Sequence, residues 1–140
     1  MNRTNKLFLA FAIFTCLSFI ALPQAMAFEP LKGDLSNYDP NNQTFPTSGD
    51  TIKVAIWDVF TGPNAYIGQS YWAVLGFVAH DINSQGGILV DGKMKKIQII
   101  KADTQGKPAP GKSAAEKAIL QDKVVVFSGV AGSHIAKVGQ

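Results

Sequence analysis

TIKVAIWDVFTGPNAYIGQSYWAVLGFVAHDINSQGGI, residues 51–88, decides the fold. Its opening run, TIKVAIW, places apolar side chains on both alternating faces, as a strand covered on both sides requires. The turn residues 61–64 end this strand, and apolar residues then recur at helical spacing between 68 and 83. Gly86 and Gly87 favour the left-handed conformation at which many helices end. This stretch therefore predicts strand, loop and helix.

A hairpin and a second helix are expected next. Residues 88–90 and 94–102 flank Asp91-Gly92, a dipeptide suited to a tight hairpin because both residues tolerate positive φ. Pro108 and Pro110 then break the chain and favour the start of a helix. We expect the inward face of that helix to carry small residues and one larger one, namely Ala114, Ala115, Ala118 and Ile119.

The third expected strand, residues 123–127, contains four consecutive large apolar residues, which is typical of a central parallel strand. It leads into SGVAGSH at 128–134, where a further helix is expected to begin. Strands that alternate with helices imply right-handed crossovers. The predicted fold class is therefore α/β, a doubly wound parallel sheet over residues 51–140, with room for one modest core.

Residues 1–27 have the three-part plan of a secretory signal peptide: a basic start, an apolar run and small residues before the cleavage point. The run, 7–22, is shorter than the roughly 20 residues that a membrane-spanning helix needs. We expect cleavage after Ala27 and a periplasmic location, with an uncleaved anchor as the alternative. Cys16, the only cysteine, lies within the run, so the mature chain needs no disulfide. Residues 28–50 predict an extended leader on the surface, or a disordered one, without chemistry.

Composition excludes several functions. The chain is 46% hydrophobic and 16% charged, as a globular protein is, and its net charge is +3. Arg3 and Lys6 leave with the signal peptide, and the lysines of 93–101 are spread through a strand region, so no nucleic-acid partner is expected. His80 and His134 stand apart in sequence, which disfavours a metal site. No pair of catalytic residues is recognisable, so we predict neither an enzyme nor a cofactor.

Ligands of open parallel sheets bind beyond the carboxyl ends of the strands, where helix N-termini also point. Three loops should lie there: 58–69, 103–110 and 128–134. The third is the best candidate, because its glycines let the backbone approach a ligand and Ser133 offers a hydroxyl at the start of a helix. Such a loop suits a carboxylate, although a plain turn with a capping serine would have the same sequence.

Several segments of this chain occur together in one family. They are residues 52–56, Thr61-Gly62-Pro63, Gly68-Gln69-Ser70, residues 81–88, Asp103, Gly129 and Gly132-Ser133. The chain thereby resembles the type I periplasmic binding proteins of branched-chain amino acid ABC transporters. The block DINSQGGI, at this distance after Thr-Gly-Pro, is the most specific element, and the resemblance covers residues 51–140.

The resemblance implies a receptor with two α/β lobes that close on a small ligand and deliver it to a membrane permease. This chain would supply a signal peptide and most of the N-terminal lobe. It ends before the second lobe, so we expect it alone to bind ligand with roughly millimolar affinity at best. The ligand would be a branched-chain amino acid or a related amide or carboxylate. The alternatives are the extracellular sensor domain of a membrane receptor, and an inactive truncated fragment.

The resemblance also assigns candidate ligand contacts. Ser133 matches the family serine that contacts the ligand carboxylate, with Ala131 and Gly132 supplying backbone groups. His134 follows, where relatives usually have a small polar residue. Two further candidates are Tyr66, as a wall of the pocket, and Asp58, which would either pair with a ligand ammonium group or cap its own loop.

Overall fold

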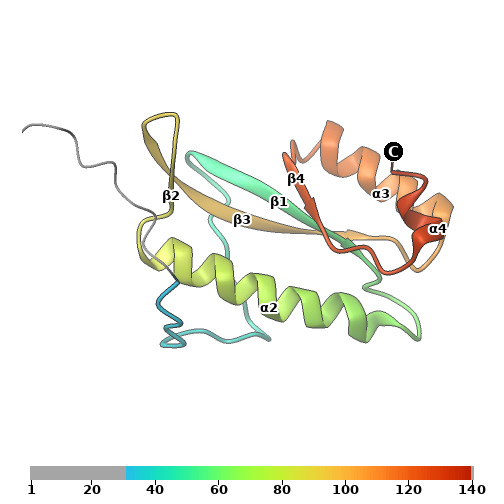
Figure 1. The fold of residues 1–140 in the computed structure, drawn as a ribbon, viewed down its shortest axis with the longest axis horizontal. Coiled ribbons are helices and arrows are strands. Elements are labelled where there is room, and N and C mark those ends of the chain that lie inside the picture. Colours follow the sequence, from blue (N-terminus) through green and yellow to red (C-terminus); the bar gives the residue numbers. More distant parts are fainter. Residues whose placement is uncertain (1–30, 140) are drawn as a thin grey trace, which may run out of the picture.

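The elements of the fold begin where the apolar patterns begin. The computed structural model describes residues 31–139, so the predicted signal peptide, Cys16 and the cleavage site after Ala27 lie outside the described residues. In chain order the elements are β1 (Thr51–Asp58), α2 (Ala65–Ser84), β2 (Ile88–Val90), β3 (Lys93–Asp103), α3 (Pro108–Leu120), β4 (Val126–Ser128) and α4 (Ser133–Ala136) (Figure 1).

The four strands form one sheet in the order β2-β3-β1-β4. β1 runs parallel to both β3 and β4, which confirms the predicted parallel sheet, and β2 pairs antiparallel with β3, which confirms the predicted hairpin. In the register of β1 and β3, Asp58 stands opposite Asp103. The carboxyl ends of these two strands therefore finish level with each other, at one edge of the sheet.

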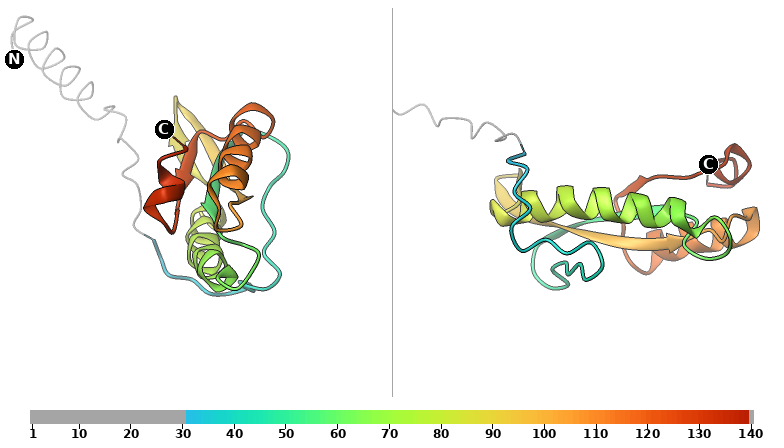
Figure 2. Two further views of the ribbon diagram at one scale, coloured as in Figure 1. Left: turned by 90° about the vertical axis from the view of Figure 1, so that its right-hand side faces the viewer. Right: turned by 90° about the horizontal axis from the view of Figure 1, so that it is seen from below.

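Helices cover both faces of the sheet, α2 on one and α3 on the other (Figure 2). Successive residues of β1 point to opposite faces, so Ile56 packs with Ala79 of α2 while Trp57 packs in the cluster on the α3 side. Trp57 Nε1 also donates a hydrogen bond to the carbonyl oxygen of Gly111 at 2.8 Å. Two apolar layers on one sheet confirm the doubly wound α/β class.

The inward face of α3 is only partly as predicted. Ala115 and Ala118 are buried and Ala114 packs against the same cluster. Ile119 was expected to face inward, and this is wrong, because half of it is exposed. Each helical residue turns about 100° from the last, so the residue after the buried Ala118 faces the flank of the helix.

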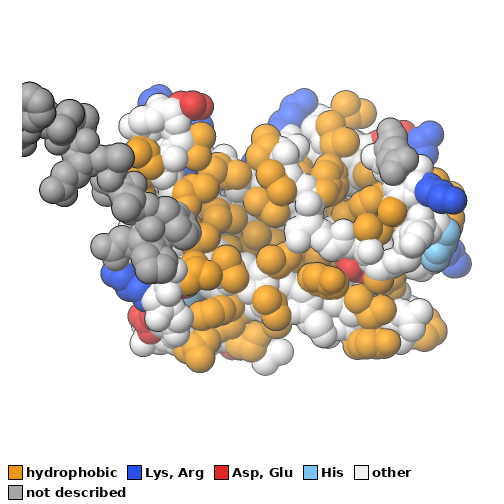
Figure 3. Space-filling view, in the orientation of Figure 1, with side chains coloured by type: hydrophobic (Ala, Val, Ile, Leu, Met, Phe, Trp, Pro, Cys, Tyr) orange, Lys and Arg blue, Asp and Glu red, His pale blue; other side chains and the backbone are white. Residues whose placement is uncertain are grey.

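The prediction of a central strand at 123–127 is also wrong in place and length. Within the described chain β4 pairs only with β1, and Val125 is 70% exposed. Figure 3 shows apolar side chains along this edge. The reason lies in the approach to β1: Lys123 has a φ of 60°, and the first backbone hydrogen bond to β1 is that of Val125 N–H to the Lys53 carbonyl, at 3.0 Å. The turn after α3 is at residues 121 and 122, and residues 123–125 lead from it into β4.

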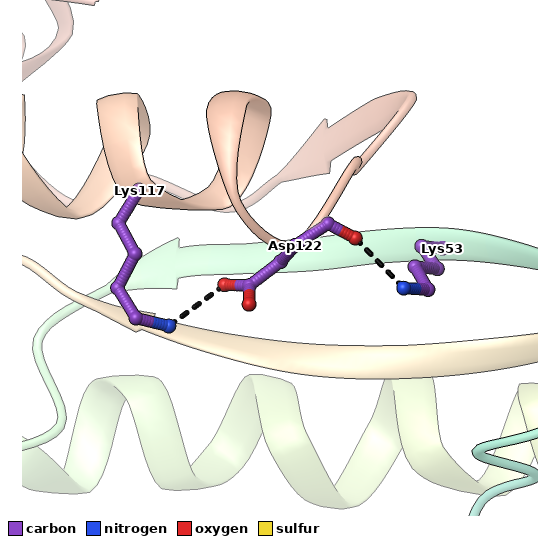
Figure 4. A network of polar contacts seen from close by, with 3 residues as sticks. All are labelled: Lys53, Lys117 and Asp122. Carbon is purple, nitrogen blue, oxygen red and sulfur yellow. Dashed lines mark hydrogen bonds and ion pairs between the residues drawn. The ribbon is translucent and has the colours of Figure 1, made fainter.

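Polar contacts hold that turn. Lys53 Nζ donates to the Asp122 carbonyl at 2.9 Å, and Lys117 Nζ lies 2.9 Å from Asp122 Oδ2 (Figure 4). Asp122 thus links the end of α3 to β1 and fixes the point from which β4 starts.

Residues 31–50 contain no helix or strand, and residues 31–46 run along the outer side of α2 (Figure 1). We call 31–46 the strap. Aromatic rings of the strap contact the helix: Tyr38 packs against Phe77, and Phe45 meets Trp72 edge-on with ring centroids 5.4 Å apart. Polar contacts between the two include Gly33 N–H to Asp81 Oδ2 (3.1 Å), Tyr38 OH to the Ala73 carbonyl, Gln43 Nε2 to the Trp72 carbonyl (3.2 Å) and His80 Nε2 with the Ser36 carbonyl (3.2 Å).

Gly76 makes the close approach of the strap possible. A Cβ at this position would lie 1.6 Å from Oε1 of Gln43, so only glycine leaves room for that side chain across the helix. Within residues 31–139 we find no helix with the length and apolar character needed to cross a membrane.

Candidate functional site

Asp58, the last residue of β1, joins two loops at the carboxyl edge. Its side chain is fully buried and accepts hydrogen bonds from three backbone N–H groups: those of Val59 at 2.7 Å, Val130 at 3.2 Å and Ala131 at 3.3 Å. Of the two predicted roles, this arrangement corresponds to capping. The carboxylate has no exposed surface with which to meet a ligand ammonium group.

Asp103, the last residue of β3, also accepts hydrogen bonds from loop residues. Its carboxylate accepts from Phe60 N–H at 2.9 Å, from Gln105 N–H at 2.9 Å and from Thr61 Oγ1 at 2.8 Å. Burial works to raise the pKa of Asp103, but these hydrogen bonds outweigh it and hold the pKa below the usual 3.8. The two loops that follow β1 and β3 are thereby fixed to each other.

The loop at 128–134 crosses this edge in an unusual backbone conformation. Val130 has a φ of 114° and Gly132 a φ of 115°. A β-branched residue rarely adopts positive φ, so the hydrogen bond from Val130 N–H to Asp58 offsets backbone strain. Ile135 anchors the far side of the loop, because it is buried and lies against Gly111.

The candidate residues of this loop differ in exposure. Gly132, Ser133 and His134 are exposed, while Ala131 is partly buried. The imidazole of His134 lies beside Gly132, where an added Cβ would come within 2.9 Å of its Cε1 atom. Ser133 begins α4, so its hydroxyl stands at the open end of the loop.

Tyr66 reaches the same edge from another element. It lies exposed in the first turn of α2, which is attached to the end of β1 by a hydrogen bond from Gly68 N–H to the Val59 carbonyl at 3.1 Å. The structure thus places all six predicted site residues at the carboxyl edge. Direct contacts join Asp58 to the 128–134 loop, whereas Tyr66 stands on the separate wall formed by α2.

Thr104 was missed by the sequence analysis. It is fully buried, its N–H donates to the Asp58 carbonyl at 2.9 Å, and its Oγ1 accepts from Gly106 N–H at 3.2 Å. The signal was present, because a threonine two residues before a glycine at a strand end is typical of a side-chain-capped turn. Thr104 positions the loop and does not face solvent.

One hollow of about 400 Å³ lies elsewhere, at the opposite end of α2. Its lining residues are Thr44, Phe45, Pro46, His80, Asn83, Ser84 and Lys96. The Asn83 amide is already engaged, because it bonds both the carbonyl and the N–H of Ile97, at 2.8 and 2.7 Å. Residues 31–139 contain no group of three or more His, Cys, Asp or Glu side chains that could hold a metal ion.

The sequence was compared with family profiles and with curated proteins. The sequence profile of the family described as periplasmic binding protein matches residues 51–140. Leu/Ile/Val-binding protein homolog 4 of Brucella abortus (strain 2308) is 33% identical over 93 residues, and the same values hold for the homologue in Brucella suis biovar 1 (strain 1330). The match covers 66% of this chain and 21% of the relative, so the chain spans about a fifth of the length of these curated relatives.

Solved structures are similar over the same part of the chain. The branched-chain amino acid transporter substrate binding protein LivJ from Streptococcus pneumoniae, in complex with isoleucine, has a TM-score of 0.56 and 27% identity over 64% of this chain and 25% of that one. A solute binding protein of an ABC transporter from Rhodopseudomonas palustris BisB5, in complex with 3,4-dihydroxy benzoic acid, has a TM-score of 0.51 and 30% identity, over 64% and 23%. The leucine binding protein LivK from Thermotoga maritima, at 22% identity with a TM-score of 0.51 over 63% and 23%, shows the fold alone.

These relatives are named as binding proteins, and none is named as an enzyme. The profile match extends over all of the described strands and helices, and the parallel sheet is the one that the sequence pattern predicted. The chain therefore belongs to the periplasmic binding protein family, in its type I, branched-chain amino acid group.

Proposed function

We propose that the protein containing this chain is an exported receptor that captures a small polar solute and delivers it to an ABC transporter permease. The observation that carries the proposal is the 128–134 loop, which is held at the carboxyl edge by Asp58 and presents the Ser133 hydroxyl to solvent. Residues 51–140 would form most of the N-terminal lobe of this receptor. The family consists of periplasmic or extracellular proteins, which supports export.

The ligand class follows from the chemistry of the loop. The bound compounds of two structural relatives, isoleucine and 3,4-dihydroxy benzoic acid, share a carboxylate. A hydroxyl beside the first N–H groups of a helix suits a carboxylate, because both donate hydrogen bonds to it. We place the ligand carboxylate against Ser133, and we favour a branched-chain amino acid or a related amide or carboxylate as the ligand.

Each remaining candidate has a narrower part in the proposal. The N–H of Ala131 is donated to Asp58, so this residue would position the loop while Gly132 and Ser133 offer their N–H groups to the ligand. His134 would flank the bound carboxylate, and the exposed ring of Tyr66 would form the facing wall. Asp58 would act only by holding the loop.

Calorimetry on the full-length protein tests this proposal. The panel should contain branched-chain and other amino acids, amides, and aliphatic and aromatic carboxylates. Hydrogen bonds to charged groups contribute about 1.5 to 3 kcal/mol, so Ser133→Ala should weaken binding by about 10-fold or more. Ser113→Ala, on the exposed surface of α3, is the matched control and should bind like the wild type. A folded protein that binds no member of the panel would refute the proposal, as would wild-type affinity in Ser133→Ala.

Export and maturation can be tested separately. We propose that the signal peptide is removed after Ala27, since small residues follow the apolar run at 7–22. Mass spectrometry of the exported protein should then give Phe28 as its first residue. A mass that includes residues 1–27 would instead favour a membrane-anchored protein.

A further inference from the structure

Lys137 follows α4 and lies on the same side of that helical turn as Ser133. Its N–H donates to the Ser133 carbonyl at 3.2 Å, and its φ of −62° and ψ of −24° continue the helical conformation. Residues four apart in a helical turn are neighbours on its surface, with about 5 to 6 Å between their Cβ atoms. The Lys137 side chain therefore starts beside the hydroxyl that we propose to meet the ligand carboxylate.

No acidic side chain of the described residues neutralises Lys137. It is exposed, and it forms no ion pair within residues 31–139. α4 packs against the first turn of α3, and the only acidic residue of α3, Glu116, already lies 3.9 Å from Lys112. Figure 3 shows basic side chains at the end of the molecule that α3 and α4 form. The positive charge of Lys137 is therefore available to a ligand.

The acidic side chains of the carboxyl edge are already engaged. The three loops that lie there contain two acidic residues, Asp58 and Asp103. Asp58 is fully buried, and the carboxylate of Asp103 accepts three hydrogen bonds from loop residues. The first turns of α2 and α3, which begin at this edge, contain no acidic residue. A cationic group of a ligand would therefore find no free carboxylate in the described part of this lobe.

We propose that Lys137 is a further ligand contact, and that it makes this lobe select carboxylates without an ammonium group over zwitterionic amino acids. The inference rests on the proposed function, because it concerns the same site and narrows the class of ligand proposed for it.

The covalent structure of an amino acid explains the selection. Its ammonium nitrogen is bonded to the carbon that bears the carboxylate, so a carboxylate at Ser133 brings the ammonium group to the same edge. There the ammonium group would meet the like charge of Lys137 and no free carboxylate of this lobe. A ligand without the ammonium group instead gains a charge-assisted contact with Lys137 and loses nothing.

Calorimetry on the full-length protein tests the inference. Each amino acid of the panel is compared with the carboxylate that lacks its α-ammonium group, for example leucine with 4-methylpentanoate. The carboxylate should bind at least about tenfold more tightly, because a charged donor that leaves water without gaining an acceptor loses about that factor or more. Its affinity should fall with added salt, because ions screen the contact with an exposed lysine.

Variants of Lys137 separate a ligand contact from a structural role. Lys137→Gln should weaken binding of the carboxylate about three- to fivefold at low salt and reduce its salt dependence, which is the range of an exposed ion pair. Lys137→Arg keeps the charge and should bind nearly like the wild type. Lys93→Gln removes an exposed lysine at the opposite end of β3 and is the matched control. Urea denaturation should find all three variants as stable as the wild type.

The outcomes distinguish the two proposals. A folded protein that binds nothing in the panel would refute the proposed function, and this inference with it. Leucine bound as tightly as 4-methylpentanoate would overturn the inference and leave the proposed function standing. Wild-type affinity and salt dependence in Lys137→Gln would also overturn it, as would an equal loss of affinity in Lys93→Gln.

Discussion

The carboxylate of Asp58 accepts a hydrogen bond from the backbone N–H of Val130, 3.2 Å away and 72 positions later in the sequence. Together with the contact to Ala131, this bond fixes the 128–134 loop to the first strand. The residue proposed to meet the ligand, Ser133, is thus placed by a buried carboxylate that does not itself reach solvent. The conformation of the 128–134 loop at the carboxyl edge of the sheet therefore depends on a buried residue.

Replacing Asp58 by Asn tests this dependence. The amide keeps the size of the side chain but removes its charge and turns one acceptor into a donor that faces backbone N–H groups. We expect a loss of about 1 to 3 kcal/mol in the free energy of unfolding, measured by urea denaturation of the full-length protein. Asp122→Asn, which breaks an ion pair with the exposed side chain of Lys117, should lose less than about 1 kcal/mol. Equal losses in the two variants would contradict the role given to Asp58.

Asp103 makes stability depend on pH. In the folded protein the pKa of Asp103 lies below its usual 3.8, so the unfolded chain binds protons more readily than the folded one. The stabilisation is fully present above that usual value and is lost as the pH falls through the lowered one. Asp103→Asn should therefore flatten the loss of stability on acidification, measured by urea denaturation at a series of pH values below about 5.

Asp34 provides the control for that experiment. The pKa of Asp34 is also lowered, first by its side-chain hydrogen bond with Ser36, but Asp34 is exposed and its partner is two residues away. Such a local contact also forms in the unfolded chain, so Asp34→Asn should leave the acid slope almost unchanged. A slope altered by Asp34→Asn and not by Asp103→Asn would reverse the assignment.

The substitution Gly76→Ala separates two effects: the packing of the strap against α2 and the stability of α2 itself. An alanine there would collide with the end of the Gln43 side chain, which can move away but loses its bond to the Trp72 carbonyl. Alanine also favours a helix over glycine by about 1 kcal/mol, so the net change in stability should be small. Hydrogen exchange should nevertheless become faster in the strap. In a Gln43→Ala background the same Gly76→Ala change should be stabilising by about 1 kcal/mol; a destabilising effect there would refute the account.

The structure leaves no space for a methyl group at Gly68. Its Cβ would lie 2.3 Å from the carbonyl oxygen of Val59, a backbone atom at the end of β1. Gly68→Ala should therefore cost at least about 1 to 3 kcal/mol and lower the melting temperature by several degrees. Gly62→Ala is the comparison, because it meets nothing within 4 Å and only its φ of 87° opposes the change, at about 1 kcal/mol. A milder effect at Gly68 than at Gly62 would contradict the close contact.

Local patterns in the sequence were sufficient to predict the elements that depend on short-range signals alone. The run at 51–57, the helical spacing before Gly86 and the dipeptide Asp91-Gly92 each predicted an element that the structure contains. Glycine at positive φ and alternation of apolar residues act over a few positions, so they are readable without knowledge of the fold.

Long-range contacts were not predictable in this way. An apolar run is consistent with a central strand, yet the pairing of Val125 and its neighbours depends on where the turn after α3 delivers the chain. The strap has no periodic pattern of apolar residues, so the sequence did not predict its packing. Its contacts with α2 depend on Gly76, and an isolated glycine within a helical pattern does not indicate such a contact. For Asp58 the sequence left two roles open, because burial is a property of the folded surroundings.

The strap forms hydrogen bonds with residues of α2 that come 29 to 48 positions later in the sequence, from Trp72 for Gln43 to Asp81 for Gly33. A chain made from its N-terminus therefore produces the strap before the helix that receives it. At about 5 to 20 residues per second, 48 positions take roughly 2 to 10 s of synthesis. The strap can therefore pack in place only after α2 has been synthesised, which makes its packing a late step in folding during synthesis.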